Sequence, residues 1–591
     1  RPICQRLHQH VFFMAAAAAS LVQRDARLDQ VLQGVQDACA KLGASQQKDI
    51  DQATSMLLSL ADSPHVIDDT CFILAHSQDE AVQFHTLGAI LQAIPRLSVE
   101  DGARQVRSLV DMREWLLHVA VVRARAWLSG HTWPAYVRSR HLRVIVMLSQ
   151  RAGGQHARAD PSPLLSLGQH MADLLNADEA CMVVGLGLAS VLAEDRPTDT
   201  SEAGSRLGLT CDEHMWCHAL MEAKIWPLLL QPLWHALHQT TDHVRQAAGS
   251  QMSSGLFYLW ALAAQAISAV LAWRSVPVPS VAKDAELTSR TAEQLWEALQ
   301  QNSAGETPAS TRRVSRALSP ILCHADVPLF LGDVARLATS MAREVPAHAF
   351  SAQQVAQAMH EAFLHVATYE LHTGDPSTST WTAQRAALLH EMHMQMEALA
   401  PRLTHADEEH VAALQHMTHA YTSLLDGASG RVLLEQAVAP ETLLEALARV
   451  TATCFHVAFE LVPLSDDAEI GAASEAALEE ALGLWRRLLI ALNGTDASAV
   501  LEYVSTHVVT PYQQGRLKAA ALVAERDVDE HGDEQERDVD LYDEQLTVYA
   551  ALARTCLDTA LSSLAAAAPP APTAATAPAI WEQWHWLALL G

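Results

Sequence analysis

The chain has 591 residues, of which 50% are hydrophobic and 18% are charged, and its formal net charge at pH 7 is −28. One hydrophobic core rarely extends beyond about 250–300 residues, so this length excludes a single-core globule and predicts several domains or a repeat array. No long block of Lys or Arg interrupts the acidic balance. Direct nucleic-acid binding through a phosphate-neutralising patch is therefore disfavoured, and a basic protein is the better partner.

The residue types favour an all-α chain. Ala and Leu are abundant, whereas the runs of Val, Ile and aromatic residues that are typical of sheets are sparse. Nine cysteines are scattered along the sequence without a paired framework. This pattern indicates a reducing compartment.

The first residues resemble a targeting segment only superficially. Residues 11–22 are apolar and follow Arg1 and Arg6, as in the h-region of a short signal peptide. However, the chain begins with Arg, and Met14 precedes a run of Ala that suits a true start. We therefore expect residues 1–24 to be a disordered or spurious N-terminal extension.

Helical periodicity begins at residue 25. It is clearest at 134–151, where apolar residues recur at three- and four-residue steps from Tyr136 to Leu148. Such helices cannot bury their apolar stripe alone, so we predict stacked helical pairs, an α-α superhelix of the HEAT or armadillo type. The predicted helices of this part are two in 25–61, broken at 43–45, and then 64–76, 79–94, 105–129, 134–151, 163–176 and 178–194, with a polar gap at 97–104.

The later part continues the same pattern. Pro227 and Pro232 should kink or divide the helix at 211–240. Further helices are predicted at 251–274, 286–302, 313–322, 327–344, 351–373, 381–399, 406–426, 439–461 and 467–493, and the pattern resumes from 497.

Residues 246–273 contain no charged side chain and are long enough to span a bilayer, which takes about 20 residues. Gln251, Gln265 and several Ser lie within this run, and no basic residues flank one side preferentially. We therefore favour a buried helix of a large helical protein and expect no membrane partner.

The C-terminal part departs from the pattern. The acidic run 525–540 is too charged to be buried, and we interpret 525–544 as an acidic loop that is either simply solvated or a handle for a basic partner. A last amphipathic stretch is predicted at 542–564. Residues 565–591 combine a low-complexity Ala/Pro tail with a Trp-rich end that has no obvious helix to pack on.

Histidine-rich clusters give only weak metal signals. His360 and His365 resemble a zincin pair, but they are five residues apart, which rotates the second ligand by about 100° from the required face. Cys211, His214 and His218 share a helical face, yet no second chelating pair accompanies them. A zinc enzyme at either cluster stays open as an alternative, but we predict no metal, no cofactor and no enzymatic activity.

Several stretches resemble, in the same order, the N-terminal half of the importin-β (karyopherin-β) superfamily, and within it the exportins. No single motif is specific, and colinearity carries the resemblance. The stretches are Ser63-Pro64 to His76, Phe84–Leu91, Arg107–Leu117, Tyr136–Gly153, Ser254–Trp273, and the acidic run followed by Tyr542–Leu546. The resemblance implies importin-β N-terminal-like HEAT repeats at 25–153 and further HEAT-like repeats at 154–564.

The resemblance also implies a function, a nuclear transport receptor that shuttles between nucleus and cytoplasm. Its partners would be a Ran-type GTPase in the GTP form, nucleoporins, and protein cargo such as translation initiation factor 5A and Smad-type factors. The implied GTPase contacts are Asp68, Asp69, Glu114, Arg138, Asp527, Asp529, Asp533, Glu534 and Glu536. The alternative is a generic HEAT-repeat scaffold for protein–protein interaction without a GTPase partner.

Overall fold

The computed structural model describes residues 26–42, 46–97, 102–156, 162–194, 207–247, 253–273, 312–313, 322, 324–370, 379–403, 407–425, 440–464, 467–491, 498–526, 535–571 and 578–591. The extension expected at 1–24 and the helix predicted at 286–302 lie outside these residues, as do Asp527, Asp529, Asp533 and Glu534. Where it is described, the chain is all-α apart from a two-residue ladder of β1 (Arg312–Arg313) and β2 (Tyr369–Glu370).

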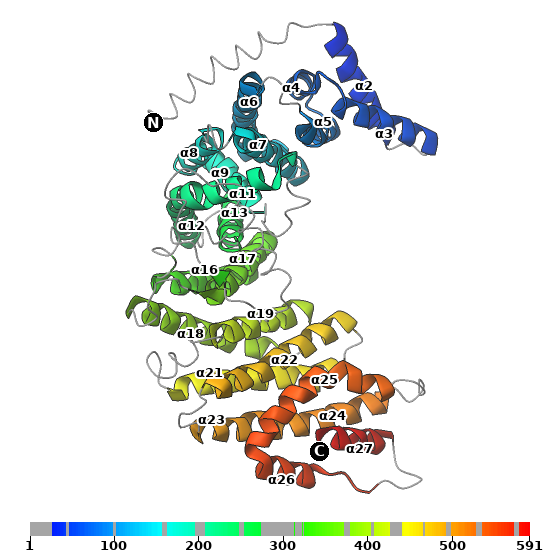
Figure 1. Ribbon diagram of the computed structural model, residues 1–591, viewed down its shortest axis with the longest axis vertical. Helices are drawn as coiled ribbons and strands as arrows, with labels where there is room; N and C mark the ends of the chain where they lie inside the picture. The colour runs from blue at the N-terminus through cyan, green and yellow to red at the C-terminus, as the bar shows by residue number, and fades with distance from the viewer. Residues whose placement is uncertain are drawn as a thin grey trace. The chain divides into compact units, whose positions relative to one another are not determined.

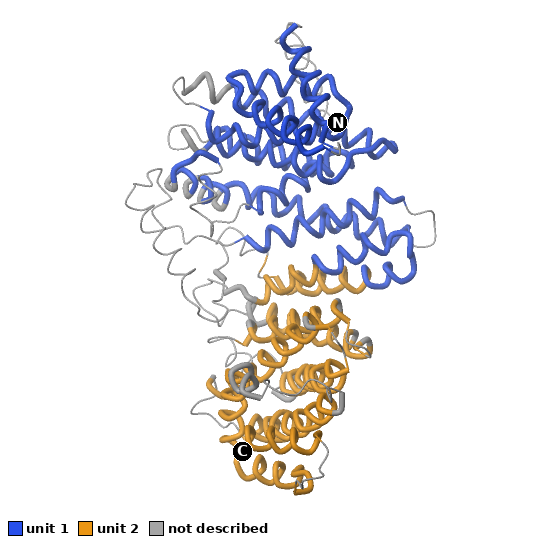
Figure 2. The backbone as a smooth tube through the Cα atoms, turned by 90° about the vertical axis from the view of Figure 1, so that its right-hand side faces the viewer, with its two compact units in different colours: residues 1–308, 313–318, 338–358 blue, residues 309–312, 319–337, 359–591 orange. Residues whose placement is uncertain are grey.

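The chain divides into two compact units, which Figure 2 colours separately. Unit 1 comprises residues 1–308, 313–318 and 338–358, and unit 2 comprises residues 309–312, 319–337 and 359–591. The boundary passes through α16 (Asp326–Glu344) and α17 (Ala349–Thr368).

Unit 1 is built from helices that pack on their neighbours in sequence (Figure 1). Its other helices are α2 (Ala26–Leu42), α3 (Gln47–Ala61), α4 (Val66–His76), α5 (Glu80–Ala93), η1 (Ile94–Arg96), α6 (Gly102–Leu128), α7 (Ala135–His156), α8 (Ser162–Leu175), α9 (Glu179–Glu194), α11 (Cys211–Leu220), η3 (Met221–Ile225), α12 (Trp226–Ala247), α13 (Ser254–Leu271) and η5 (Pro346–His348). The pairs α2–α3, α4–α5, α6–α7 and α8–α9 are in contact, and the second helices of these pairs also contact one another in the order α3, α5, α7, α9.

Unit 2 shows the same sequence-order packing. Its helices are α18 (Ser379–Leu399), η6 (Ala400–Arg402), α19 (Glu408–Leu425), α21 (Pro440–His456), η8 (Val457–Leu461), η9 (Val462–Leu464), α22 (Ala468–Ala491), α23 (Ser498–Tyr503), η10 (Val504–Val509), α24 (Thr510–Arg526), α25 (Gln535–Ala553), η11 (Arg554–Cys556), α26 (Leu557–Ala567) and α27 (Pro578–Leu590). The helices form two rows, and successive helices within a row are in contact. The rows are α19–α22–α25 and α21–α24–α27.

In the part of the chain that the structure describes, three π-helical turns, η3, η8 and η10, directly follow α-helices, and each ends two residues before a proline. A proline lacks the backbone N–H that an α-helix needs, and its ring clashes with the carbonyl four residues earlier. Each π turn relieves this clash because the residue before the proline donates to the carbonyl five residues back, as Trp226 does to Met221. The kink predicted for Pro227 therefore takes the form of a π turn, whereas Pro232 lies inside α12.

The apolar run predicted as a buried helix forms α13. Phe257 and Trp260 on this helix are fully buried, and α13 packs against α9 and α12. Two described helical stretches, Ser254–Leu271 and Leu443–Leu464, have the length and composition of a membrane span, and 61% of each is buried inside the protein. The first is thus a core helix of unit 1, as expected.

The C-terminal part differs from the expectation at two points. The interpretation of 525–544 as a loop is wrong for its second half, because α25 begins at Gln535 rather than at residue 542. Acidic residues are favourable in the first turn of a helix, where they face the positive end of the dipole. The Trp-rich end does have a helix to pack on, since α27 contacts α24 and α25.

Candidate protein-binding surface

The two stretches that carry the clearest helical pattern, α5 and α7, pack directly on each other. The guanidinium of Arg140 lies 3.5 Å from the ring centroid of Phe84, and its Nη1 donates to the Phe84 carbonyl at 3.2 Å. Gly88 makes this approach possible, because a Cβ there would lie 2.9 Å from the same nitrogen. The ring of Tyr136 contacts Phe84 edge-on at 5.3 Å. The α5–α7 pair is the structural reference for the positions of the proposed contact residues.

Asp68 and Asp69, at the start of α4, have opposite surroundings. Asp69 is 2% exposed and accepts from Arg27 at 2.7 Å and from the Ser63 hydroxyl at 2.9 Å. Asp68 is exposed, and burial together with the Asp68 carboxylate raises the pKa of the Cys71 thiol to about 12. Asp69 thus joins α4 to α2 and is buried, whereas the Asp68 side chain is exposed to solvent.

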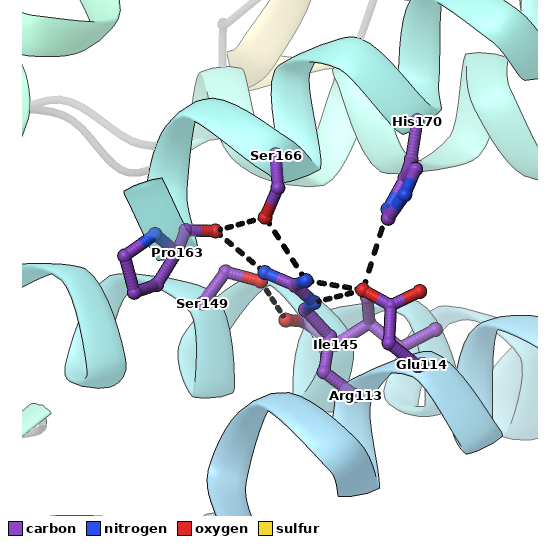
Figure 3. A network of polar contacts seen from close by, with 7 residues as sticks. All are labelled: Arg113, Glu114, Ile145, Ser149, Pro163, Ser166 and His170. Atoms are coloured by element: carbon purple, nitrogen blue, oxygen red, sulfur yellow. Dashed lines mark hydrogen bonds and ion pairs between the residues drawn. The ribbon is translucent and has the colours of Figure 1, made fainter. Parts of the chain in front are cut away.

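Glu114 belongs to a polar network between α6 and α8 (Figure 3). Its neighbour Arg113, which is 1% exposed, donates to Glu114, to the Pro163 carbonyl at 2.5 Å and to the Ser166 hydroxyl at 3.0 Å. The His170 ring nitrogen Nδ1 lies 3.4 Å from the Glu114 carboxylate. Since Glu114 compensates a buried guanidinium, its first role is structural.

Arg138 of α7 is flanked by aromatic rings from α6, from α13 and from the segment between α6 and α7. Its guanidinium lies 4.7 Å from the ring centroid of Tyr258, 5.5 Å from that of Trp127 and 5.8 Å from that of Trp133. Burial raises the pKa of the Tyr258 hydroxyl, and the neighbouring Arg138 partly opposes this change. Cation–π contacts of this kind stabilise packing, so Arg138 joins α6, α7 and α13.

The acidic segment is only partly described. Glu536 lies in the first turn of α25, and the other four acidic residues proposed there lie outside the described residues. Unit 2 also carries exposed carboxylates on α22 and, beyond its first turn, on α25. Glu479 and Glu544 face each other there, and burial together with the hydrogen bond to Glu544 raises the pKa of Glu479. This part of unit 2 therefore keeps a local excess of negative charge.

The helix α3 presents a surface that the sequence interpretation did not single out. A shallow hollow on its outer side is lined by Asp51, Thr54, Ser55, Leu58, Ser59 and Asp62. Leu58, one of these lining residues, is 49% exposed. The sequence carries a signal for this surface, because Leu58 is apolar but lies outside the helical face on which Ala53 and Leu60 are buried. An exposed leucine with an acidic rim is suited to a protein contact.

The histidine clusters do not form a metal centre among the residues that the structure describes. His214 and His218 are both buried, with their Nε2 atoms 3.3 Å apart, but no group of three or more His, Cys, Asp or Glu is placed to hold a metal ion in the described ranges. The side chain of Cys211 lies outside the described part. His360 and His365 both lie on α17. Neither cluster gains a third described ligand.

Comparison with known proteins gives no assignment. No protein-family model matches the chain, and no characterised protein matches it significantly. The functional argument therefore depends on the packing of the helices and the placement of their charged residues.

Proposed function

We propose that the chain is a helical-repeat nuclear transport receptor, similar to exportin-4, that binds a Ran-type GTPase in its GTP form and carries protein cargo through the nuclear pore. The fold that goes with this proposal is a HEAT- or armadillo-like solenoid. The task of such a protein is binding and not bond making, and it requires neither a cofactor nor a metal.

The observation that carries the proposal is the stacking order of unit 1. Consecutive helices pair, and the second helices of the pairs contact one another from α3 to α9. Repeats that each contact only their neighbours create an extended row of exposed surface, which repeat proteins use to bind large partners. The stretches that resemble the exportins, Ser63-Pro64 to His76 through Tyr136–Gly153, lie within this stack.

The charge of the chain supports a protein partner of opposite sign. At −28, the net charge steers a basic partner and raises its rate of association, an effect that salt weakens. Of the residues proposed to contact the GTPase, Asp68 is exposed, and the α3 hollow around Leu58 is a further exposed surface that we add to the proposal. Glu536 and its acidic neighbours form the second proposed contact.

The mechanism is a coupling of two binding events. If GTPase and cargo both favour one curvature of the helical stack, each raises the affinity of the other by the same factor. Hydrolysis of GTP in the cytoplasm then removes this coupling and releases the cargo. Translation initiation factor 5A is the first cargo to test.

The decisive experiment is a pull-down with Ran-type GTPase locked in the GTP form or loaded with GDP. We expect binding to the GTP form only, weakened by Asp68→Lys and by charge reversal of Asp527, Asp529, Asp533, Glu534 and Glu536. Glu179→Lys is the matched control, because Glu179 is also an exposed acid in the first turn of a unit 1 helix. Equal binding to both nucleotide forms, or none, contradicts the receptor and leaves the generic scaffold.

A further inference from the structure

The helices α6 and α7 are basic, although the chain as a whole is strongly acidic. Residues 102–156 contain nine arginines against two acidic residues, Asp111 and Glu114, and therefore have a net charge of +7 in a chain of net charge −28. The helix α7 alone has four arginines and no acidic residue. Exposed charges that lie more than about 8 Å apart are largely screened in physiological salt. A ligand at this surface therefore responds mainly to the local positive charge.

Three of these arginines, Arg123, Arg138 and Arg140, form no ion pair with an acid among the described residues and contact neutral groups instead. Arg123 donates from Nη1 to Oε1 of Gln83 at 2.5 Å and is largely buried. Arg138 lies against the aromatic rings described above. Arg140 donates to the Phe84 carbonyl at 3.2 Å and is only partly buried. Arg140 is thus the unpaired arginine that is best placed for a ligand.

Arg140 shares one face of α7 with Tyr136 and Arg143, because these residues recur at steps of four and three. Tyr136 and the side chain of Arg143 are each 51% exposed. Burial, and to a lesser degree the neighbouring Arg143, lower the pKa of Arg140, but a guanidinium stays charged in proteins. The facing side of α5 supplies Phe84 and His85, whose rings meet edge-on at 5.4 Å. These five residues form what we call the α5–α7 patch.

The guanidinium of Arg140 is held in place while most of its donors stay available. It stacks on the Phe84 ring, and among the described residues only its Nη1 has a hydrogen-bond acceptor. The remaining nitrogens, Nε and Nη2, lie along one edge of the guanidinium and present a fork of N–H groups. Such a fork binds a carboxylate through two parallel hydrogen bonds. Because the ring already fixes the fork, a ligand loses little entropy in ordering it.

Two carboxylates lie beside the patch without neutralising Arg140. Glu194 of α9 accepts from Arg143 at 2.7 Å, and Glu80 accepts from the Tyr136 hydroxyl at 3.4 Å. Both members of the Arg143–Glu194 pair are about half exposed, and such surface pairs contribute little to stability. A carboxylate that binds Arg140 is therefore able to displace Glu194 from Arg143 at small cost.

We propose that the α5–α7 patch binds a short acidic segment of a partner protein, with a carboxylate on Arg140 and Arg143 and an apolar side chain against Tyr136. Arginine and tyrosine are the residue types that often dominate the binding energy of protein interfaces. A nucleic acid is less suited, because its charge continues past the patch into an acidic chain. The inference concerns unit 1 alone, and its ligand is opposite in charge to the partner that the whole chain attracts.

The test uses the full chain and a fluorescent peptide in which glutamates flank one phenylalanine, with binding followed by fluorescence anisotropy. The wild type should bind this peptide, more weakly as salt rises, and should not bind a second peptide with glutamine at every glutamate position. Arg140→Met should weaken binding at least about tenfold, because it removes a charge-assisted, two-bond contact. Arg245→Met is the matched control and should behave like wild type, since it removes the same charge from α12 of unit 1.

A gain of binding is tested as well, because Arg140→Met also removes packing between α5 and α7. Glu194→Gln frees Arg143 and should strengthen binding of the glutamate peptide about two- to fivefold. The proposal is overturned if the wild type does not bind that peptide, if the glutamine peptide binds equally well, or if Glu194→Gln brings no gain. Equal losses in Arg140→Met and Arg245→Met would show non-specific attraction and would also overturn it. Tighter binding of a single-stranded RNA than of the peptide would assign the patch to nucleic acid instead.

Discussion

Acid should weaken the packing of α6 on α7 through one histidine. His141 is 1% exposed, and its Nε2 donates to the Leu116 carbonyl at 2.9 Å. The other ring nitrogen, Nδ1, is buried and meets no hydrogen-bond acceptor among the described residues. Burial, and to a lesser degree the Arg123 guanidinium, lower the pKa of His141 from 6.5 to about 3. The imidazole is therefore neutral in the folded chain at physiological pH.

The size of the effect follows from the two pKa values. Because the folded pKa lies below the unfolded one, the unfolded chain binds more protons, and stability is lost as the pH falls below 6.5. The stabilisation that the neutral His141 contributes is fully present above pH 6.5, and it would be lost completely near the folded pKa. Between pH 8 and pH 5 the loss attributable to His141 is about 2 kcal/mol.

Hydrogen exchange of the α7 amides measures this loss in the full chain. The opening free energy, corrected for intrinsic exchange, is compared at pH 8 and pH 5 in the wild type and in His141→Gln. Glutamine keeps a donor for the Leu116 carbonyl but cannot be protonated, so the variant should lack the His141 contribution while all other titrating groups act equally in both. The same pH-dependent loss in both chains would refute the argument.

Three further predictions concern unit 2 and are checked by thermal and urea denaturation. A Cβ at Gly515 would lie 2.1 Å from Cδ2 of Phe459, so Gly515→Ala should destabilise by about 1–3 kcal/mol. At Gly483 a Cβ would meet nothing within 4 Å, so Gly483→Ala should raise the free energy of unfolding by about 0.5–1 kcal/mol. A change in stability of the same sign in both glycine variants would contradict the prediction. Arg516→Met should lower the free energy of unfolding by about 3 kcal/mol. This value is near the lower end of the range for breaking a buried ion pair, because the side chain of Glu475, the partner of Arg516, is 30% exposed. Adding Glu475→Gln should recover part of that loss, and no recovery would mean that stacking of Arg516 on the neighbouring aromatic rings dominates.

The helices were predictable because their signals are local. Apolar spacing and prolines located α2 to α9 to within a few residues, and the run of α13 was correctly assigned to the core. The start of α25 was missed because charge alone was taken to exclude a helix, although acidic residues in a first turn favour one. The Trp-rich α27 was missed because its partner, α24, lies more than fifty residues earlier in the sequence.

The roles of individual side chains were much less predictable. Asp68 and Asp69 are adjacent and chemically identical, yet only Asp69 meets Arg27, which is 42 residues away. Likewise, nothing in the sequence around Arg138 shows that Tyr258 will cover it. Such pairings depend on how distant helices stack, and periodicity reports only which face of a helix is apolar. The sequence therefore predicted charged faces, and the structure separates exposed acids from those that neutralise buried arginines.

The three π turns bear on how this chain can change in length. A turn closed by an i→i+5 bond holds one residue more than an α turn, so each of these helices already accommodates what amounts to a one-residue insertion. The prolines that follow, Pro227, Pro463 and Pro511, favour the wider turn because they cannot supply the α-helical bond. Loss of a single residue there would remove the extra residue of the π turn and leave the faces of the helix on both sides in place, although the proline would again clash with the carbonyl four residues earlier. At other points within a helix, the same loss would rotate every later side chain by about 100° and bury the wrong face.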